Sequence, residues 1–317
     1  MDALKQEEHQ FNSDVPNEWF VPLNKEKGIA EAVVRPSISY WKDVWIRLFK
    51  NKLAMLGLII LVILILMAIF GPILSSQSDT RLNFKNQNLP PSSSHWFGTD
   101  NLGRDIFART WDGARISLFV GIMAALIDFL IGVIYGGIAG YKGGKIDNLM
   151  MRIVEVLYGL PYLLVVILLM VVMGPGLKTI IVALTVTGWV GMARIVRGQV
   201  LQIKNYEYVL ASKTFGTKTS RIIRKSLLPN TMGTIIVQMT LTVPSAIFAE
   251  AFLSFIGLGI APPFASWGVM ANDGLPAITS GYWWTLFFPA FFISLTMFAF
   301  NVLGDGLQDA LDPKLRR

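Results

Sequence analysis

YEYVLASKTFGTKTSRIIRKSLLPN, residues 206–230, is the stretch that decides how this chain is folded. It is polar and basic, and long apolar runs stand on both sides of it. Charge of this density is excluded from hydrocarbon, so the stretch predicts a loop on the water side of a membrane, long enough for two short helices. A loop built in this way is suited to docking another protein.

The composition of the chain indicates an integral membrane protein. Hydrophobic residues make up 53%, charged residues 15%, and mean hydropathy is +0.52, whereas soluble domains have about 25% charged residues. Six apolar segments are long enough to cross a hydrocarbon core of about 30 Å as helices. They are residues 53–74, 116–140, 153–173, 179–193, 234–256 and 282–303.

The distribution of basic residues predicts the orientation of these spans. The fourth span is the shortest, with 15 residues between Lys178 and Arg194, whose long side chains can reach the interfaces. If the amino terminus is cytoplasmic, the inside segments hold 22 Lys and Arg residues and the outside segments hold 6. The positive-inside rule therefore places both termini in the cytoplasm.

The segments around the spans follow from this topology. Trp41, Trp45 and Leu48 recur at helical spacing among basic residues, which predicts an amphipathic helix in the membrane interface. The first span lacks a small-residue cleavage site, so it is expected to be retained. The expected organisation is a cytoplasmic tail at 1–37, the interfacial helix at 38–52, the first span at 53–74, an extracellular loop at 75–115, a core with five spans at 116–303 that contains the cytoplasmic loop 198–230, and a cytoplasmic terminus at 304–317.

Polar and helix-breaking residues within the spans have alternative interpretations. Asp128 and Glu250 are the carboxylates deepest in apolar sequence, and a proton-coupled carrier would need such groups. Each stands without a His or second acid nearby in sequence, which favours a structural role. Pro161 and Pro244 interrupt the hydrogen-bond ladders of the third and fifth spans and predict kinks or hinges, in a gating helix or in an inert bundle.

Three glycines predict close packing of the second span. Gly132, Gly136 and Gly140 fall four residues apart. Small residues at that spacing let two helix backbones approach closely in lipid, where packing drives association.

Several classes of function are excluded or disfavoured. The net charge of +7 flanks the predicted membrane, so lipid headgroups explain it better than nucleic acid. Without cysteine the chain has no disulfide or thiolate chemistry. Gly174, Gly176 and Lys178 lack the order of a phosphate-binding loop, and His9 and His95 are too isolated for a metal site. We therefore expect a non-catalytic chain with no bound cofactor or metal.

The loop at 206–230 resembles the coupling motif of ATP-binding-cassette importer permeases. The resemblance rests on Leu210-Ala211-Ser212, on Gly216 four residues after Ser212, and on Leu228-Pro229; the sequence departs from the motif at Leu210, where glutamate is usual, and at Ser226, where isoleucine is usual. A short helix over 206–215, capped by Gly216, and a second helix beginning over 217–225 are expected. The coupling residues implied are Tyr206, Glu207, Leu210, Ala211, Ser212, Lys213, Phe215, Gly216, Leu228 and Pro229.

Three further segments narrow the family. Residues 95–118, 254–268 and 303–313 are similar to segments of the C-type permease subunit of oligopeptide and dipeptide importers. The resemblance implies an all-α integral membrane protein of type I importer architecture, with six transmembrane helices and a cytoplasmic coupling helix. From the predicted topology alone, residues on the outer face are expected to contact the receptor or to gate the pathway: Phe97, Gly98, Asp100, Arg104, Asp105, Pro263 and Trp267.

The resemblance also implies partners and a location. It implies oligopeptide import across a bacterial cytoplasmic membrane by this subunit, a second permease subunit, two cytoplasmic ATPase subunits that bind ATP and Mg, and an extracellular peptide-binding protein. Two alternatives stay open. The family also imports nickel chelates or metallophores, and a secondary carrier of another class would use an ion gradient through Asp128 or Glu250.

Overall fold

The computed structural model describes residues 39–74, 82–261 and 263–312. The tail predicted at 1–37 lies outside the described residues. The described residues from Tyr40 onward form one compact unit, and their ordered elements are helices, apart from an isolated β-bridge between Thr99 and Asp105. The all-α expectation is confirmed.

The helices follow one another with short connections along most of the chain. In order they are α1 (Tyr40–Lys50), α2 (Lys52–Leu74), α3 (Ile106–Lys142), α4 (Gly144–Tyr158), α5 (Tyr162–Met173), α6 (Leu177–Ile203), α7 (Glu207–Thr214), α8 (Thr219–Ile222), α9 (Leu228–Phe255), α10 (Trp267–Ile278) and α11 (Trp284–Leu311), with a short 3-10 turn at Phe84–Asn86 and a π turn at Ile223–Leu227.

The number of spans agrees with the prediction. Among the described residues, α2, α3, α6, α11 and the helix that runs through α8 into α9 are long and apolar enough to cross a membrane. The pair α4 and α5 meets the same test together, with a bend of 81° between them. Counted as one broken span, this pair gives the sixth.

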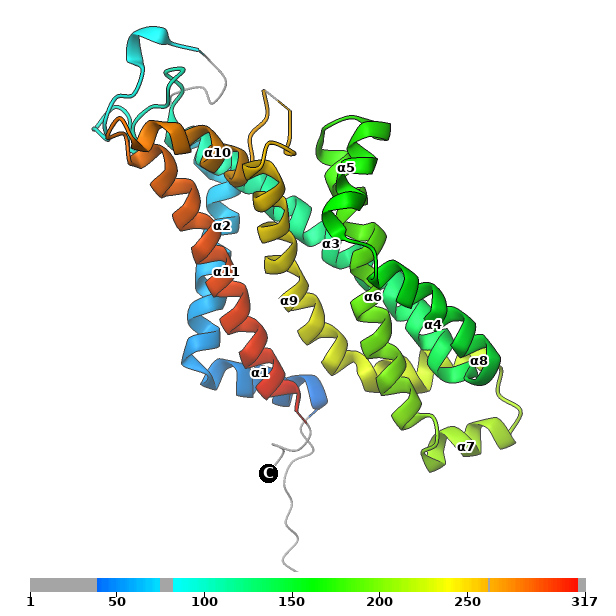
Figure 1. The fold of residues 1–317 in the computed structure, drawn as a ribbon. Coiled ribbons are helices and arrows are strands. Elements are labelled where there is room, and N and C mark those ends of the chain that lie inside the picture. The colour runs from blue at the N-terminus through cyan, green and yellow to red at the C-terminus, as the bar shows by residue number, and fades with distance from the viewer. Residues whose placement is uncertain (1–38, 75–81, 262, 313–317) are drawn as a thin grey trace, which may run out of the picture. The chain divides into compact units, whose positions relative to one another are not determined.

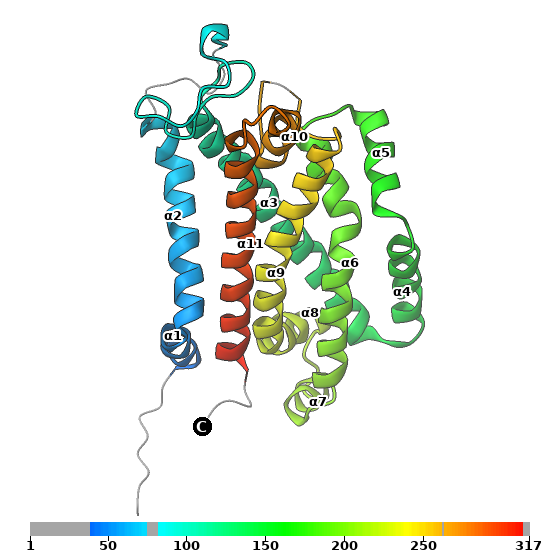
Figure 2. The same ribbon diagram turned by 60° about the vertical axis from the view of Figure 1, so that its left-hand side comes forward.

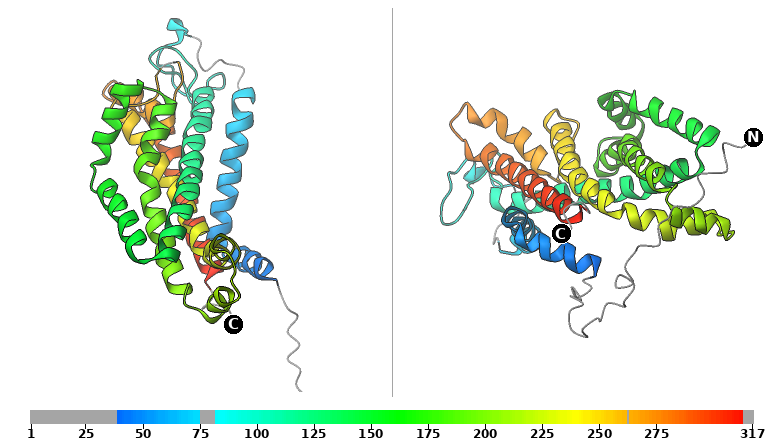
Figure 3. Two further views of the ribbon diagram at one scale, coloured as in Figure 1. Left: turned by 90° about the vertical axis from the view of Figure 1, so that its right-hand side faces the viewer. Right: turned by 90° about the horizontal axis from the view of Figure 1, so that it is seen from below.

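The long helices lie side by side and leave short elements at both ends (Figures 1 and 2). Helix α3 packs along α2, α6 and α9, and α11 packs along α2, α9 and α10. One end carries α10 and the loop 82–105, and we call it the α10 end. The opposite end carries α1 and α7 and is called the α7 end; the right-hand view of Figure 3 looks onto it.

Four helices extend beyond the predicted spans; one of them is α9, which begins at Leu228 and not at residue 234. Helix α3 begins at Ile106 inside the predicted outer loop, because the Oδ1 of Asp105 accepts a hydrogen bond from the backbone N–H of Ala108 at 2.8 Å and caps it. Helix α6 continues past the predicted end at residue 193, and α11 continues to Leu311. The predicted spans were ended at charged side chains. In the structure, a helix continues past a charged side chain where that side chain has an interaction partner.

The two prolines behave differently. Pro161 precedes the first residue of α5, at the bend between α4 and α5, and its predicted kink is confirmed. Pro244 lies inside α9, which continues through it. The predicted interruption at Pro244 therefore does not divide the helix.

The three glycines of α3 let its backbone approach α6, as predicted. A Cβ at Gly132 would lie 2.6 Å from the Cβ of Met192, and one at Gly140 would lie 2.9 Å from the carbonyl oxygen of Arg197. A Cβ at Gly136 would overlap the carbonyl oxygen of Ala193. Real side chains do not approach this closely, so glycine is required for this packing.

Candidate functional site

The segment between α6 and α9 forms a projection at the α7 end (Figure 1). Its helices α7 and α8 are anchored by Val209 and Ile222, which are 0% and 1% exposed and pack with apolar residues of α3, α6 and α9. Hydrophobic burial of these two side chains holds the projection to the bundle.

The projection presents most of the predicted coupling residues to the outside. Phe215 is 87% exposed and Leu210 is 45% exposed. Among the predicted residues, Ser212 and Leu228 are half-buried and the rest are exposed: Tyr206, Glu207, Leu210, Ala211, Lys213, Phe215, Gly216 and Pro229.

Gly216 ends α7 in the way the sequence predicted. Its φ of +70° is in the left-handed region that favours glycine. The N–H of Gly216 donates to the carbonyl of Lys213 at 2.9 Å, and the N–H of Thr217 donates to that of Ser212 at 3.1 Å. The second helix begins at Thr219, within the expected range, and continues through the π turn into α9.

Basic side chains surround the exposed apolar residues of the projection. Lys218, Arg221, Arg224 and Lys225 are exposed, and Lys213 lies with its Nζ 5.1 Å from the ring centre of Tyr141 on α3. The surface is positive with apolar and aromatic side chains within it. Such a surface complements an acidic groove on a partner protein.

At the α10 end, an ion-pair cluster closes the loop over α3. The Oδ2 of Asp100 accepts from the Nε of Arg104 at 2.7 Å and from Arg109 at 2.5 Å, and Arg109 also reaches Asp273 at 3.3 Å. The Oδ2 of Asp105 bonds to the Nδ1 of His95 at 2.9 Å. Arg109 and Asp273 were not identified from the sequence, because they come from two helices whose contact the sequence does not reveal.

Three of the residues predicted to be receptor-facing or gating are buried in this structure. Asp100, Asp105 and Trp267 are 6%, 4% and 0% exposed. They therefore offer almost no surface to a partner in this conformation, because their polar atoms are used within the loop or against α3. The indole N–H of Trp267, for example, donates to the carbonyl of Thr110 at 2.8 Å.

The same applies to the predicted residues Phe97, Gly98 and Arg104, toward the end of the loop. Phe97 stacks on Phe288 with ring centres 3.9 Å apart, and Gly98 has a φ of +80° against the ring of Trp284. The side chain of Arg104 is 12% exposed. These residues shape the α10 end from within, and a gating role for them stays a prediction.

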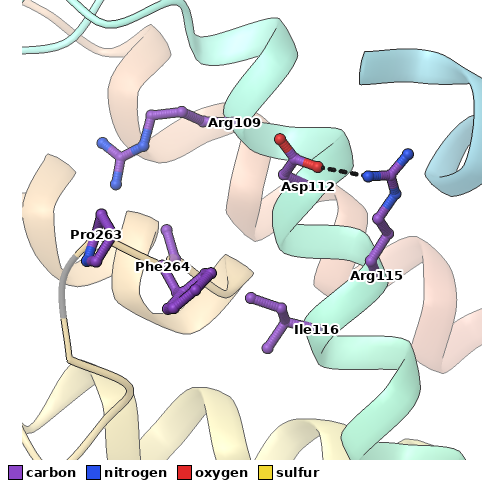
Figure 4. Close-up of a pocket in the computed structure, with 7 residues that line it drawn as sticks. Arg109, Asp112, Arg115, Ile116, Pro263 and Phe264 are labelled. Atoms are coloured by element: carbon purple, nitrogen blue, oxygen red, sulfur yellow. Dashed lines mark hydrogen bonds and ion pairs between the residues drawn. The ribbon is translucent and has the colours of Figure 1, made fainter. Parts of the chain in front are cut away.

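Pro263 does lie on an open surface (Figure 4). It lines a cavity of about 260 Å³ together with Arg109, Asp112, Arg115, Ile116, Phe264 and Ala265. Phe264 is 65% exposed, and Asp112 accepts from Arg115 at 3.0 Å. This cavity, between the first turns of α3 and the loop before α10, is the part of the predicted outer site that is open.

The two intramembrane carboxylates have different surroundings. Glu250 is 0% exposed, and its carboxylate accepts from Ser254 at 2.7 Å and from Ser117 at 3.3 Å. These contacts support its structural role. Asp128 lines a cavity of about 350 Å³ between α3, α5, α6 and α9. The other polar lining residues, among them Tyr162, Gln238 and Thr242, were missed because single polar residues in apolar runs give no distinct sequence signal.

Comparison with known proteins identifies the family. Residues 132–317 match the family described as binding-protein-dependent transport system inner membrane component. The chain belongs to this family. Residues 39–91 match the N-terminal transmembrane domain of oligopeptide transport permease C, so the two matches cover both the first span and the core of this inner membrane component.

Individual relatives are similar over nearly the whole length. The chain is 78% identical, over 100% of its length and 98% of the relative's, to the dipeptide transport system permease protein DppC of Bacillus subtilis. It is 61% identical to the oligopeptide transport system permease protein OppC of the same organism, over 96% of this chain and 99% of that relative. It is 43% identical to OppC of Escherichia coli, over 88% of this chain and 92% of that relative.

A solved structure supports the fold. The inward-facing MetNI methionine ABC transporter aligns with a TM-score of 0.52 and 22% identity, over 63% of this chain and 94% of that one. At this identity the likeness concerns the fold alone. It agrees with the importer permease architecture expected for an inner membrane component of such a transport system.

Proposed function

We propose that this chain is the permease subunit of an ATP-driven importer that carries oligopeptides across the bacterial cytoplasmic membrane. The names of its relatives, which are dipeptide and oligopeptide transport permeases, support the cargo. In this proposal the subunit pairs with a second permease and works with two cytoplasmic ATPase subunits and an extracellular peptide-binding protein. ATP and Mg are bound by the ATPase subunits.

The observation that carries the proposal is the exposed but anchored projection at the α7 end. Phe215 and Leu210 present apolar surface outside the spans, while Val209 and Ile222 fix α7 to the bundle. An exposed aromatic residue surrounded by basic side chains is suited to insertion into a groove of a partner. The ATPase is the partner that the mechanism requires here.

Coupling then follows from the connectivity of the helices. Closure of the ATPase pair on ATP moves α7, and the adjoining α6 and α9 change the access of the pathway from inward to outward. Hydrolysis resets the bundle, because a nucleotide shifts an equilibrium only through its different affinities for the two states. In this arrangement the α7 end and both termini are cytoplasmic, as the excess of basic residues on that side supports.

ATP dependence tests this proposal against an ion-gradient carrier. The complete complex is reconstituted into vesicles with its peptide receptor, and uptake of a radiolabelled peptide is measured with internal ATP or with a proton gradient alone. We expect uptake with ATP and none with the gradient. Uptake that needs only the gradient would contradict the proposal. Competition by nickel chelates in the same vesicles tests the alternative cargo.

Substitution of Gly216 tests the role of α7 in coupling. Gly216→Trp places a large side chain on the docking surface and forces a left-handed backbone onto a residue that disfavours it, so uptake is expected to be abolished while the receptor still binds peptide. Gly144 has a φ of +57° and, like Gly216, has open space where a Cβ would lie. Gly144→Trp is therefore the matched control, with uptake largely retained. Normal uptake by an assembled Gly216→Trp complex would contradict this role.

A further inference from the structure

A cavity of about 350 Å³ lies among the predicted membrane-spanning helices. Its lining comes from α3, α5, α6 and α9, and includes Asp128, Tyr162, Thr187, Gly188, Gln238, Thr242 and Ser245 together with the apolar residues Ala124, Leu184, Leu241, Ala246 and Ala249. Its volume is within the range of small-ligand sites. Its mixed lining suits an organic molecule more than a bare ion.

Among the described residues that line the cavity, Asp128 is the one charged residue. Asp128 is 5% exposed, and its Oδ1 is buried and accepts no hydrogen bond from the described residues. The hydroxyl of Tyr162, on the same cavity, is likewise buried without a described partner. A buried carboxylate without a partner is costly, so these two groups indicate a ligand.

The backbone next to Asp128 leaves room for its carboxylate. A Cβ at Gly188 on α6 would lie 2.6 Å from the Oδ2 of Asp128. Glycine at this position therefore lets the carboxylate lie against α6. The same helix has Gly191, where a Cβ would meet nothing within 4 Å.

We propose that Asp128 binds the terminal ammonium group of a peptide as the peptide passes through the cavity. This inference rests on the proposed function, since it assigns a site to the peptide in transit. A primary ammonium pairs with a carboxylate by charge-assisted hydrogen bonds, and the side chains of Thr187, Gln238 and Thr242 provide donors and acceptors for the adjoining peptide group.

Thiol labelling tests the site without relying on transport. The chain has no cysteine, so Ser245→Cys, at an exposed position on the cavity, gives a single reactive thiol. The rates of labelling by a cationic and by an uncharged methanethiosulfonate reagent are compared in the assembled complex. Addition of Asp128→Asn is expected to lower the cationic-to-neutral ratio by about threefold or more, from the loss of one charge. An unchanged ratio would overturn the proposal.

Peptide uptake tests the ligand. In the reconstituted complex, Asp128→Asn is expected to lower the peptide transported per ATP hydrolysed by about tenfold, the effect of losing one hydrogen bond to a charged group. Receptor affinity and receptor-stimulated ATP hydrolysis are expected to stay unchanged. If Asp128→Asn lowers the labelling ratio but leaves uptake normal, the assignment of a peptide as the ligand of Asp128 is overturned. If the unmodified complex shows no ATP-driven uptake, the proposed function is contradicted, but the negative charge of the cavity is not.

Gly188 and Gly191 of α6 provide the matched pair of variants. Gly188→Ala displaces the Asp128 carboxylate and is expected to lower uptake per ATP, whereas Gly191→Ala has open space and is expected to be neutral. Equal uptake by the two variants would contradict the placement of the carboxylate.

Discussion

Glu250 is the most completely buried charged side chain of the spans among the described residues, and its contacts define what it does. Its carboxylate accepts hydrogen bonds from the hydroxyls of Ser117 and Ser254. The Oγ of Ser117 also accepts a hydrogen bond from the backbone N–H of Trp267 at 3.3 Å. Glu250 therefore ties α9 to α3 and to the start of α10. It has no exposed surface through which an ion could reach it.

Removal of this carboxylate is expected to affect stability and not coupling. Glu250→Leu leaves two buried hydroxyls without their acceptor, at a cost of about 1–3 kcal/mol each, so the midpoint of thermal unfolding of the purified complex should fall. Uptake per folded complex should be retained. Glu155→Gln, which removes an exposed ion pair to Arg152, is the control and should change stability by less than about 1 kcal/mol. Loss of uptake by a stable Glu250→Leu complex would favour the ion-coupled alternative.

Substitution of Phe215 gives a direct test of the docking proposal. Phe215→Ala removes an 87% exposed ring, so the permease itself should keep its stability. If the ring is an anchor, its loss weakens ATPase association by about 2 kcal/mol, or about thirtyfold in affinity. Quantitative pull-down of the ATPase subunits measures this effect.

The control is an exposed phenylalanine at the other end. Phe84 is 63% exposed in the turn of the α10 end, and Phe84→Ala should leave ATPase association unchanged. Equal retention of ATPase by both variants would show that Phe215 is not an anchor.

At the scale of elements, the contact between α3 and α6 is sensitive to side-chain size. Gly136→Ala drives a methyl group into the backbone of α6, which should destabilise the complex by about 1–3 kcal/mol. Gly137→Ala, one residue further, places its Cβ at ordinary contact distance, 3.7 Å, from Ile223 and Leu228. It should be nearly neutral. Survival of the complex after heating, measured by size-exclusion chromatography, distinguishes them, and similar losses in both would contradict the packing.

The elements also show what sequence could and could not predict. Apolar length identified every span, and Pro161 identified the break in the third, because both are local properties of the chain. The carboxyl-terminal end of α6 was misplaced because Arg194 was treated as the stop. In the fold, Arg194 lies over the ring of Tyr158 at 4.4 Å, and the Nε of Arg197 donates to the Oδ1 of Asp147 at 2.6 Å.

Contacts between distant segments limited the prediction of the site. Helix α10 has a local signal in Ser266, whose Oγ accepts from the N–H of Val269 at 3.2 Å, yet its packing against α9 and α11 depends on residues far along the chain. The exposed loop residues around Gly216 were predicted because turn chemistry and charge are local. The cavity at Asp128 was not, since four helices form it.

At the scale of the molecule, the apolar surfaces require surroundings other than water. In the most apolar windows of α2 and α11, 28% and 22% of residues are buried within the chain. Lipid and a second permease subunit account for the remainder in our proposal. The α7 end then has to face the ATPase compartment, which makes the sidedness of α7 the condition on which the account depends.

The most direct test is therefore the accessibility of α7 from each side of the membrane. Phe215→Cys introduces one thiol into a chain that has none, and a membrane-impermeant maleimide is applied to intact cells and to cells permeabilised beforehand. We predict no labelling of intact cells and rapid labelling after permeabilisation, slowed when the ATPase subunits are bound. Labelling of Phe215→Cys in intact cells would place α7 outside and contradict the account.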